Sequence, residues 1–205
     1  MDLRISATGV SKVFNRRTIF REITFAVGTT QTMLISGRNG SGKSTLVKII
    51  ARLLTPTGGY VDFEGTTRPD EAGRLALLGM VSPYLQMYEE FSAQENLQFA
   101  LAIRGLHPEV QWIHELLKRV ALFPRKDDPV RTYSSGMKQR VKYAFALVHR
   151  PPILILDEPM ANLDAEGVAI VRGIMEEHRR KGILVVATND LTDIERPDVA
   201  VNLNG

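Results

Sequence analysis

This chain of 205 residues contains no cysteine, which excludes disulfides and thiolate metal sites. Long apolar runs are missing as well. The most apolar stretches, residues 153–156 and 183–187, are far shorter than the ~18 residues that a membrane-spanning helix requires. The first 14 residues have no apolar core followed by a cleavage site, so we expect no signal peptide. Any role at a membrane would therefore depend on a partner.

The chain also has almost no excess of positive over negative charge. The 26 Lys and Arg residues outnumber the 23 Asp and Glu residues by only three. An imbalance this small fits a solvated surface better than a nucleic-acid interface, so we expect no nucleic-acid partner. The apolar share of 44% and the charged share of 24% are ordinary for a globular protein. The length suits one domain that can bury a core, with room for an inserted lobe.

Strand patterns dominate the first third of the chain, and a helix follows a Gly-rich loop. We expect strands over residues 4–8, 19–27, 31–36 and 60–65. Apolar residues at helical spacing come after the loop: Leu46, Ile49, Ile50 and Leu53. The first part, about residues 1–65, is therefore expected to form a β lobe together with the Gly-rich loop.

Helical patterns dominate the middle part, about residues 88–150. Ser92 and Glu95 form a capping-box pattern before an apolar stripe. Pro108 suits the first residue of a second helix, and a third helix ends before Pro151. We expect these helices to form a lobe inserted into the core.

The last part, about residues 151–205, returns to strands. The runs 153–156 and 183–187 are entirely apolar, as in parallel strands that are covered on both faces. A helix over residues 165–180 joins them, and residues 197–205 resemble a final strand. The alternation predicts an α/β fold with a parallel sheet and right-handed crossovers.

The Gly-rich loop GRNGSGKST matches the complete P-loop pattern between an expected strand and an expected helix. Its glycines let the backbone curl so that N–H groups surround phosphate oxygens, and the helix N-terminus adds positive potential. Lys43 can reach the β- and γ-phosphates, and the Ser44 hydroxyl can ligate Mg²⁺. We expect ATP to contact the whole loop: Gly37, Arg38, Asn39, Gly40, Ser41, Gly42, Lys43, Ser44 and Thr45.

Two adjacent carboxylates, Asp157 and Glu158, follow the apolar run 153–156. Ligands bind at the carboxyl ends of parallel strands, so both side chains should face the nucleotide. We expect Asp157 to hold Mg²⁺ through its water shell and Glu158 to orient or deprotonate the attacking water. The alternative is an acidic pair at an ordinary strand exit.

Together these motifs resemble the ATP-binding cassette (ABC) transporter ATPases over nearly the whole chain. The segment YSSGMKQR, residues 133–140, stands where that family has its LSGGQ-like signature loop. The resemblance implies a P-loop NTPase (RecA-like) parallel-sheet core with an N-terminal antiparallel β lobe and an inserted helical lobe. It also implies that two subunits, most simply a homodimer, pair head to tail. Ser134 and Gly136 of one subunit would then contact the ATP that is bound to the other.

Two further positions match the family pattern. Phe14 matches the aromatic residue that stacks on adenine, although a core position is the alternative. Asp164 matches the loop that joins the two subunits, although it would also serve as the N-cap of the following helix. From the resemblance we expect no regulatory extension after the last expected strand.

The sequence departs from the family pattern at three places. Asn189 stands where a switch histidine is usual, and an amide can donate a hydrogen bond but cannot carry a proton. We therefore expect slow or weakly coupled hydrolysis. The signature has Ser135 and Met137 where Gly and Gln are usual. The glutamine that senses metal and γ-phosphate is displaced, and Gln86 is the nearest amide.

The segment SPYLQMYEEF, residues 82–91, is rich in aromatic side chains and Met. In the family this region receives a helix of the membrane subunit, and such residues favour interfaces. We expect a groove that involves four of them: Tyr84, Met87, Tyr88 and Phe91. Packing between the two lobes is the alternative.

The leading hypothesis is an ATPase subunit that powers an ABC transporter with ATP and Mg²⁺. It would lie in the cytoplasm, on the inner face of a membrane, through a separate membrane-spanning partner. The alternative is a soluble ABC-type ATPase that acts on ribosomes or nucleic acid. A P-loop kinase would not explain the signature segment or Glu158. The short length resembles the haem-export ATPases of cytochrome c maturation, but the sequence does not encode the substrate.

Overall fold

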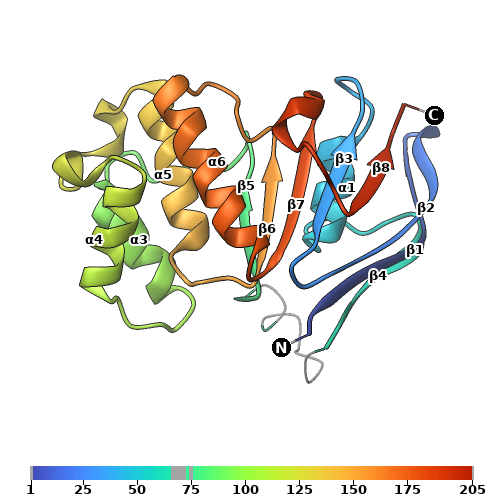
Figure 1. Cartoon of the computed structure of the whole chain (residues 1–205), viewed down its shortest axis with the longest axis horizontal. Helices are drawn as coiled ribbons and strands as arrows, with labels where there is room; N and C mark the ends of the chain where they lie inside the picture. The colour runs from blue at the N-terminus through green and yellow to red at the C-terminus, as the bar shows by residue number, and fades with distance from the viewer. Residues whose placement is uncertain (1, 66–72, 74–75, 205) are drawn as a thin grey trace.

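The computed structural model describes residues 2–65, 73 and 76–204, so Met1 and Gly205, at the ends of the expected first and last parts, lie outside it. A parallel sheet forms its centre, with strand order β5-β6-β7-β3-β8 (Figure 1). These strands are Leu78–Val81, Ile153–Asp157, Ile183–Thr188, Thr32–Ser36 and Val199–Asn202. The expected α/β fold with a parallel sheet is confirmed.

An antiparallel sheet of β2, β1 and β4 lies on one side of this centre, and a helical lobe lies on the other (Figure 1). The strands β2, β1 and β4 of the antiparallel sheet are Arg17–Gly28, Arg4–Phe14 and Gly58–Glu64. The helices are α1 Lys43–Ile50, α3 Ala93–Ala102, α4 Val110–Arg119, α5 Ser135–Leu147 and α6 Ala165–Arg179. Short 3₁₀ turns cover Phe123–Arg125, Val130–Thr132 and Leu191–Asp193.

The central strands are apolar on both faces because each face meets its own core. In β6, Ile153 and Ile155 join α1 and the antiparallel sheet, whereas Leu154 and Leu156 join the helices α3 to α6. This division follows from the two-residue period of a strand. Each fully buried aliphatic side chain contributes roughly 1.5–3 kcal/mol. The two cores hold the carboxyl ends of β3, β6 and β7 side by side.

The capping box at Ser92 is confirmed. Its hydroxyl accepts a hydrogen bond from the Glu95 amide at 3.2 Å, and the Glu95 carboxylate accepts one from the Ser92 amide at 2.7 Å. The expected role of Pro108 is wrong, because α4 begins at Val110 with Glu109 as its N-cap. Among the described residues, no helix combines the length and apolar character needed to cross a bilayer.

Three other expectations about elements need correction. Leu53 is not on the inner face of α1, because the helix ends at Ile50 and the Leu53 side chain is exposed. The strand β5 was not expected, since its four residues are too few to show a period. The first strand continues to Phe14 because the tight turn at Asn15 and Arg16, both with positive φ, lets it pair with β2.

Candidate nucleotide-binding site

The loop between β3 and α1 has a shape that depends on glycine. Gly40 and Gly42 have φ angles of 82° and 104°, where a side chain is strained. A Cβ atom on Gly42 would also lie 2.4 Å from Cγ2 of Ile19, on β2. The loop therefore folds tightly against the antiparallel sheet, which the sequence pattern alone does not show.

The backbone of this loop presents a set of free donors. Among the described residues, no acceptor is paired with the N–H groups of Gly40, Gly42, Lys43, Ser44 and Thr45. Helix α1 begins at Lys43 without a side-chain cap. Unpaired amides at a helix N-terminus bind anions, and phosphate oxygens suit this arrangement.

Lys43 is buried and is held at the centre of the loop. Its Nζ donates to the Gly37 carbonyl at 2.8 Å and lies 3.2 Å from Oε1 of Glu158. The sequence separates Lys43 from Glu158 by more than a hundred residues, and the parallel sheet brings them together. The ammonium group and the carboxylate thus face the same space beside the free amides.

Asp157 is nearly inaccessible, at 1% exposure. Neither of its carboxylate oxygens has a hydrogen-bond partner among the described residues. Burial raises its pKa, and the Glu158 charge adds to this, while the Ser44 hydroxyl and the Lys43 charge act in the opposite direction. A buried carboxylate without partners next to a hydroxyl fits a divalent cation, which would supply the missing positive charge.

Asn189 follows β7 and reaches the same loop. Its Nδ2 donates to Oδ1 of Asn39 at 3.4 Å. The side chain is exposed beside the free amides, so a bound phosphate would lie within its reach. A second asparagine, Asn204, accepts a hydrogen bond from the Arg38 amide at 2.7 Å. No spacing signal in the sequence indicated Asn204, because it lies 166 residues from Arg38 and only the pairing of β3 with β8 brings the two together.

The signature residues lie elsewhere in the chain. Ser134 caps α5 by accepting a hydrogen bond from the Met137 amide at 3.2 Å. Within the described parts of the chain, no hydrogen bond or ion pair joins residues 134–137 to residues 37–45. Helix α5 belongs to the helical lobe, across the parallel sheet from α1 (Figure 1). One copy of the chain therefore does not bring these two motifs together.

Gln86 is exposed and lines a cavity of about 310 Å³ with Lys138 and Lys142 of α5. In the described residues it makes no hydrogen bond with the loop of residues 37–45. The structure thus leaves Gln86 at the junction of the two lobes.

Phe14 is 43% exposed, so the alternative of a core position is wrong. Its ring lies at the end of β1, 4.7 Å from the Lys12 ammonium. Asp164 does cap α6, accepting a hydrogen bond from the Gly167 amide at 2.8 Å. That contact accounts for Asp164 within a single copy.

The segment of residues 82–91 is divided between surface and core. Tyr84, Tyr88 and Phe91 are exposed, but Met87 is buried among the helices, so its expected place in a surface groove is wrong. Tyr84 stacks under the Lys48 ammonium at 4.4 Å. Both line a cavity of about 430 Å³ that also contains Leu53, Arg104 and Phe145. This groove is apolar with a positive rim.

Comparisons with known proteins agree with this geometry. A family model described as "ABC transporter" matches residues 20–161. The lantibiotic transport ATP-binding protein SrtF of Streptococcus pyogenes is 31% identical over 187 residues, covering 91% of this chain and 80% of SrtF. The cytochrome c biogenesis ATP-binding export protein CcmA of Cupriavidus pinatubonensis is 34% identical over 178 residues, covering 85% and 78%.

Solved structures give the same fold. A structure described as the ATP-binding subunit of an ABC transporter superposes with a TM-score of 0.86 at 27% identity, covering 98% of this chain and 85% of the other. The dimeric cassette MJ0796 superposes with a TM-score of 0.85 at 24% identity, covering 98% and 94%.

Proposed function

Because the chain belongs to the ABC transporter family, we propose that it binds and hydrolyses ATP to power a transporter. The observation that carries this proposal is the cluster of free loop amides around Lys43, with Glu158 3.2 Å from its Nζ. The cluster offers donors for a triphosphate and a base for the attacking water at one place. Relatives named for lantibiotic transport and for cytochrome c biogenesis cover similar shares of this chain, so the comparison does not favour one substrate over the other. A haem-related substrate remains a prediction.

In this proposal, the loop amides and Lys43 hold the phosphates. Phe14, with an exposed ring, stacks on the adenine. Ser44 and Asp157 would hold Mg²⁺, which when bound neutralises charge that develops on the phosphate oxygens. Glu158 then leaves Lys43, whose ammonium turns to the phosphates, and accepts the proton of the attacking water.

The site is completed by a second copy. Ser134 and Gly136 lie at the N-terminus of α5, away from the loop of their own copy. The N-terminus of α5 carries the positive potential of the helix dipole. In a head-to-tail homodimer it would face the γ-phosphate held by the partner subunit. The dimeric MJ0796 cassette has the same fold as this chain.

The apolar groove around Tyr84 is the proposed docking place for a membrane-spanning subunit, which would hold the chain on the inner face of the membrane. Detergent extracts of the host membranes test this with a tagged chain. We expect an integral membrane protein to copurify, and Tyr84→Ala to release it, whereas Tyr60→Ala, an exposed tyrosine on β4, leaves it bound. Copurification with ribosomes or nucleic acid instead would favour the soluble alternative.

Replacing Asn189 by histidine should raise ATP turnover. Asn189 lies beside Asn39 in the loop, so a histidine there would reach the γ-phosphate and could carry a proton, which the amide cannot. We expect a gain of about tenfold in steady-state phosphate release, less than the ~10²–10⁴-fold of a complete acid–base group, because the asparagine already supplies the hydrogen bond. An unchanged rate, in a wild-type chain that already turns over normally, would contradict the proposed role of Asn189.

Gln86→Ala should weaken the response of turnover to Mg²⁺. Its exposed side chain at the lobe junction is free to move toward the metal when the lobes close. We expect a several-fold higher Mg²⁺ requirement, of the order of one lost hydrogen bond. The control is Gln111→Ala, an exposed glutamine on α4. A Mg²⁺ titration identical to wild type would remove Gln86 from the site.

A further inference from the structure

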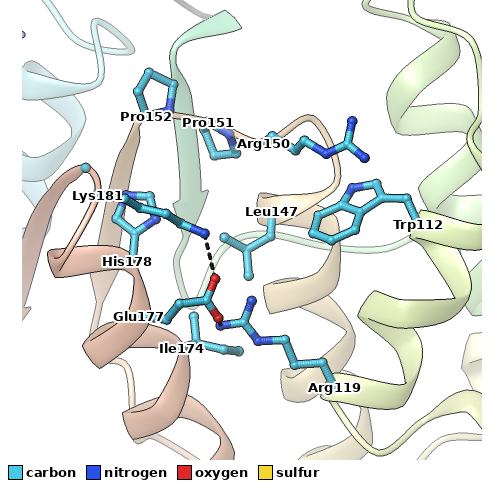
Figure 2. A pocket seen from close by; sticks show the side chains of 11 residues that line it. Trp112, Arg119, Leu147, Arg150, Pro151, Pro152, Ile174, Glu177, His178 and Lys181 are labelled. Atoms are coloured by element: carbon cyan, nitrogen blue, oxygen red, sulfur yellow. Dashed lines mark hydrogen bonds and ion pairs between the residues drawn. The ribbon is translucent and has the colours of Figure 1, made fainter. Parts of the chain in front are cut away.

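Another cavity lies at the edge of the sheet opposite the nucleotide loop. It has a volume of about 460 Å³ and is lined by α4, the end of α5, the end of α6 and the segments that precede β6 and β7 (Figure 2). The amino ends of the strands are here, and the first residue of β6 lies about 13 Å along the strand from Asp157 at ~3.3 Å per residue. The cavity is therefore separate from the ATP site.

Three permanent cations line this cavity, against one carboxylate. Arg119 and Lys181 both pair with Glu177, each at 2.6 Å, and Arg150 lies across from them (Figure 2). Arg150 in turn pairs with Glu109, which is outside the lining. Glu177 thus shares its charge between two cations, and the lining is left with an excess of positive charge.

A fourth group, His178, lines the cavity but adds no charge near neutral pH. It is buried beside Pro152 and Gly182, and burial lowers its pKa to about 4. Its ring faces the backbone at Pro152 and Ile183, whose hydrogen-bonding groups raise its pKa and so act against the effect of burial.

The rest of the cavity wall is mainly apolar. Trp112 lines it opposite α6, with the Arg150 guanidinium 4.7 Å from its ring. Leu147, Ile174 and two prolines complete the wall. Small-molecule sites have this composition: an enclosed apolar surface of ~300–1,000 Å³ with a few polar groups that orient the ligand.

We propose that this cavity binds a small organic anion with a flat apolar body. The acidic group pairs with Arg119 and Lys181, and the apolar body lies between Trp112 and Ile174. Trp112 and Arg119 belong to the helical lobe, whereas Ile174 and Lys181 belong to the core. A bound anion therefore contacts both lobes at once.

The test uses naphthalene-2-carboxylate as a probe, with Trp112 as the reporter. Trp112 is the only tryptophan, and its indole N–H donates to the Val148 carbonyl at 2.8 Å, so one resonance in a ¹⁵N-correlated spectrum reports on the site. We expect a saturable shift of that resonance, with a Kd of about 1 mM or below. Naphthalene-2-carboxamide, which has the same shape without the charge, should bind at least about tenfold more weakly.

Variants give effects of opposite sign. Arg119→Gln with Lys181→Gln should weaken probe binding about tenfold, whereas Glu177→Gln should tighten it by releasing both cations. Arg179→Gln, which removes an exposed α6 arginine outside the cavity, should change nothing. Equal binding of acid and amide, no saturable shift, or no effect of the double variant would each overturn the proposal. ATP binding, measured separately, does not enter any of these outcomes.

Discussion

Glu158→Gln is expected to lower ATP turnover at least about a hundredfold while ATP still binds. The substitution keeps the shape of the side chain but removes the only base that the structure brings next to Lys43 among the described residues. General-base catalysis contributes typically ~10²–10⁴-fold. The side chain is partly exposed, and its Lys43 contact is lost anyway when nucleotide binds, so the fold should tolerate the change. Phosphate release at saturating ATP measures the effect.

A matched control for this experiment is Glu166→Gln. Glu166 is an exposed carboxylate in the first turn of α6, near an arginine rather than near the loop. Its turnover should equal that of the wild type. The Glu158→Gln chain should also form an ATP-dependent dimer, because bound ATP is not hydrolysed and stays in the site. Size-exclusion chromatography detects this dimer. A Glu158→Gln rate within a few-fold of wild type would remove Glu158 from the catalytic role.

Gly42→Ala is expected to reduce ATP binding by at least about tenfold. An alanine there meets two costs, of which the first is the left-handed backbone at φ 104°, roughly 1–2 kcal/mol for a residue with a Cβ. The second is contact with the antiparallel sheet, at 2.4 Å from Ile19 and 3.1 Å from Phe20. The loop or β2 must shift, and the amides lose their convergence on phosphate. Titration with a fluorescent ATP analogue measures the loss.

Gly40→Ala separates these two costs. Gly40 has a similar φ of 82°, but a Cβ there meets nothing within 4 Å. It should therefore lose much less affinity than Gly42→Ala, and its melting temperature should fall less, because only the alanine at position 42 meets β2. Equal losses at the two positions would mean that backbone strain alone, and not contact with β2, controls the loop.

Much of the fold followed from local patterns. The continuous apolar runs located β6 and β7, the helical period and the Ser92 capping box located α3, and the alternation of elements predicted the parallel sheet. The short strand β5 was not predicted, because four residues show no period. The start of α4 was predicted wrongly, because a proline near a helix start does not define the first helical residue. Element types are local properties, whereas exact boundaries depend on packing.

The sequence by itself predicted the phosphate loop and the acidic pair, because their proposed chemistry depends on residue types at fixed short spacing. Only the tertiary structure decided which distant side chains join them. Two such contacts join segments far apart in the chain, that of Asn189 with Asn39 and that of Asn204 with Arg38. Met87 is likewise buried by helices that come later in the sequence. The same holds for the cavity between α4 and α6. Such contacts depend on how two cores pack against one sheet, and no spacing along the chain records that.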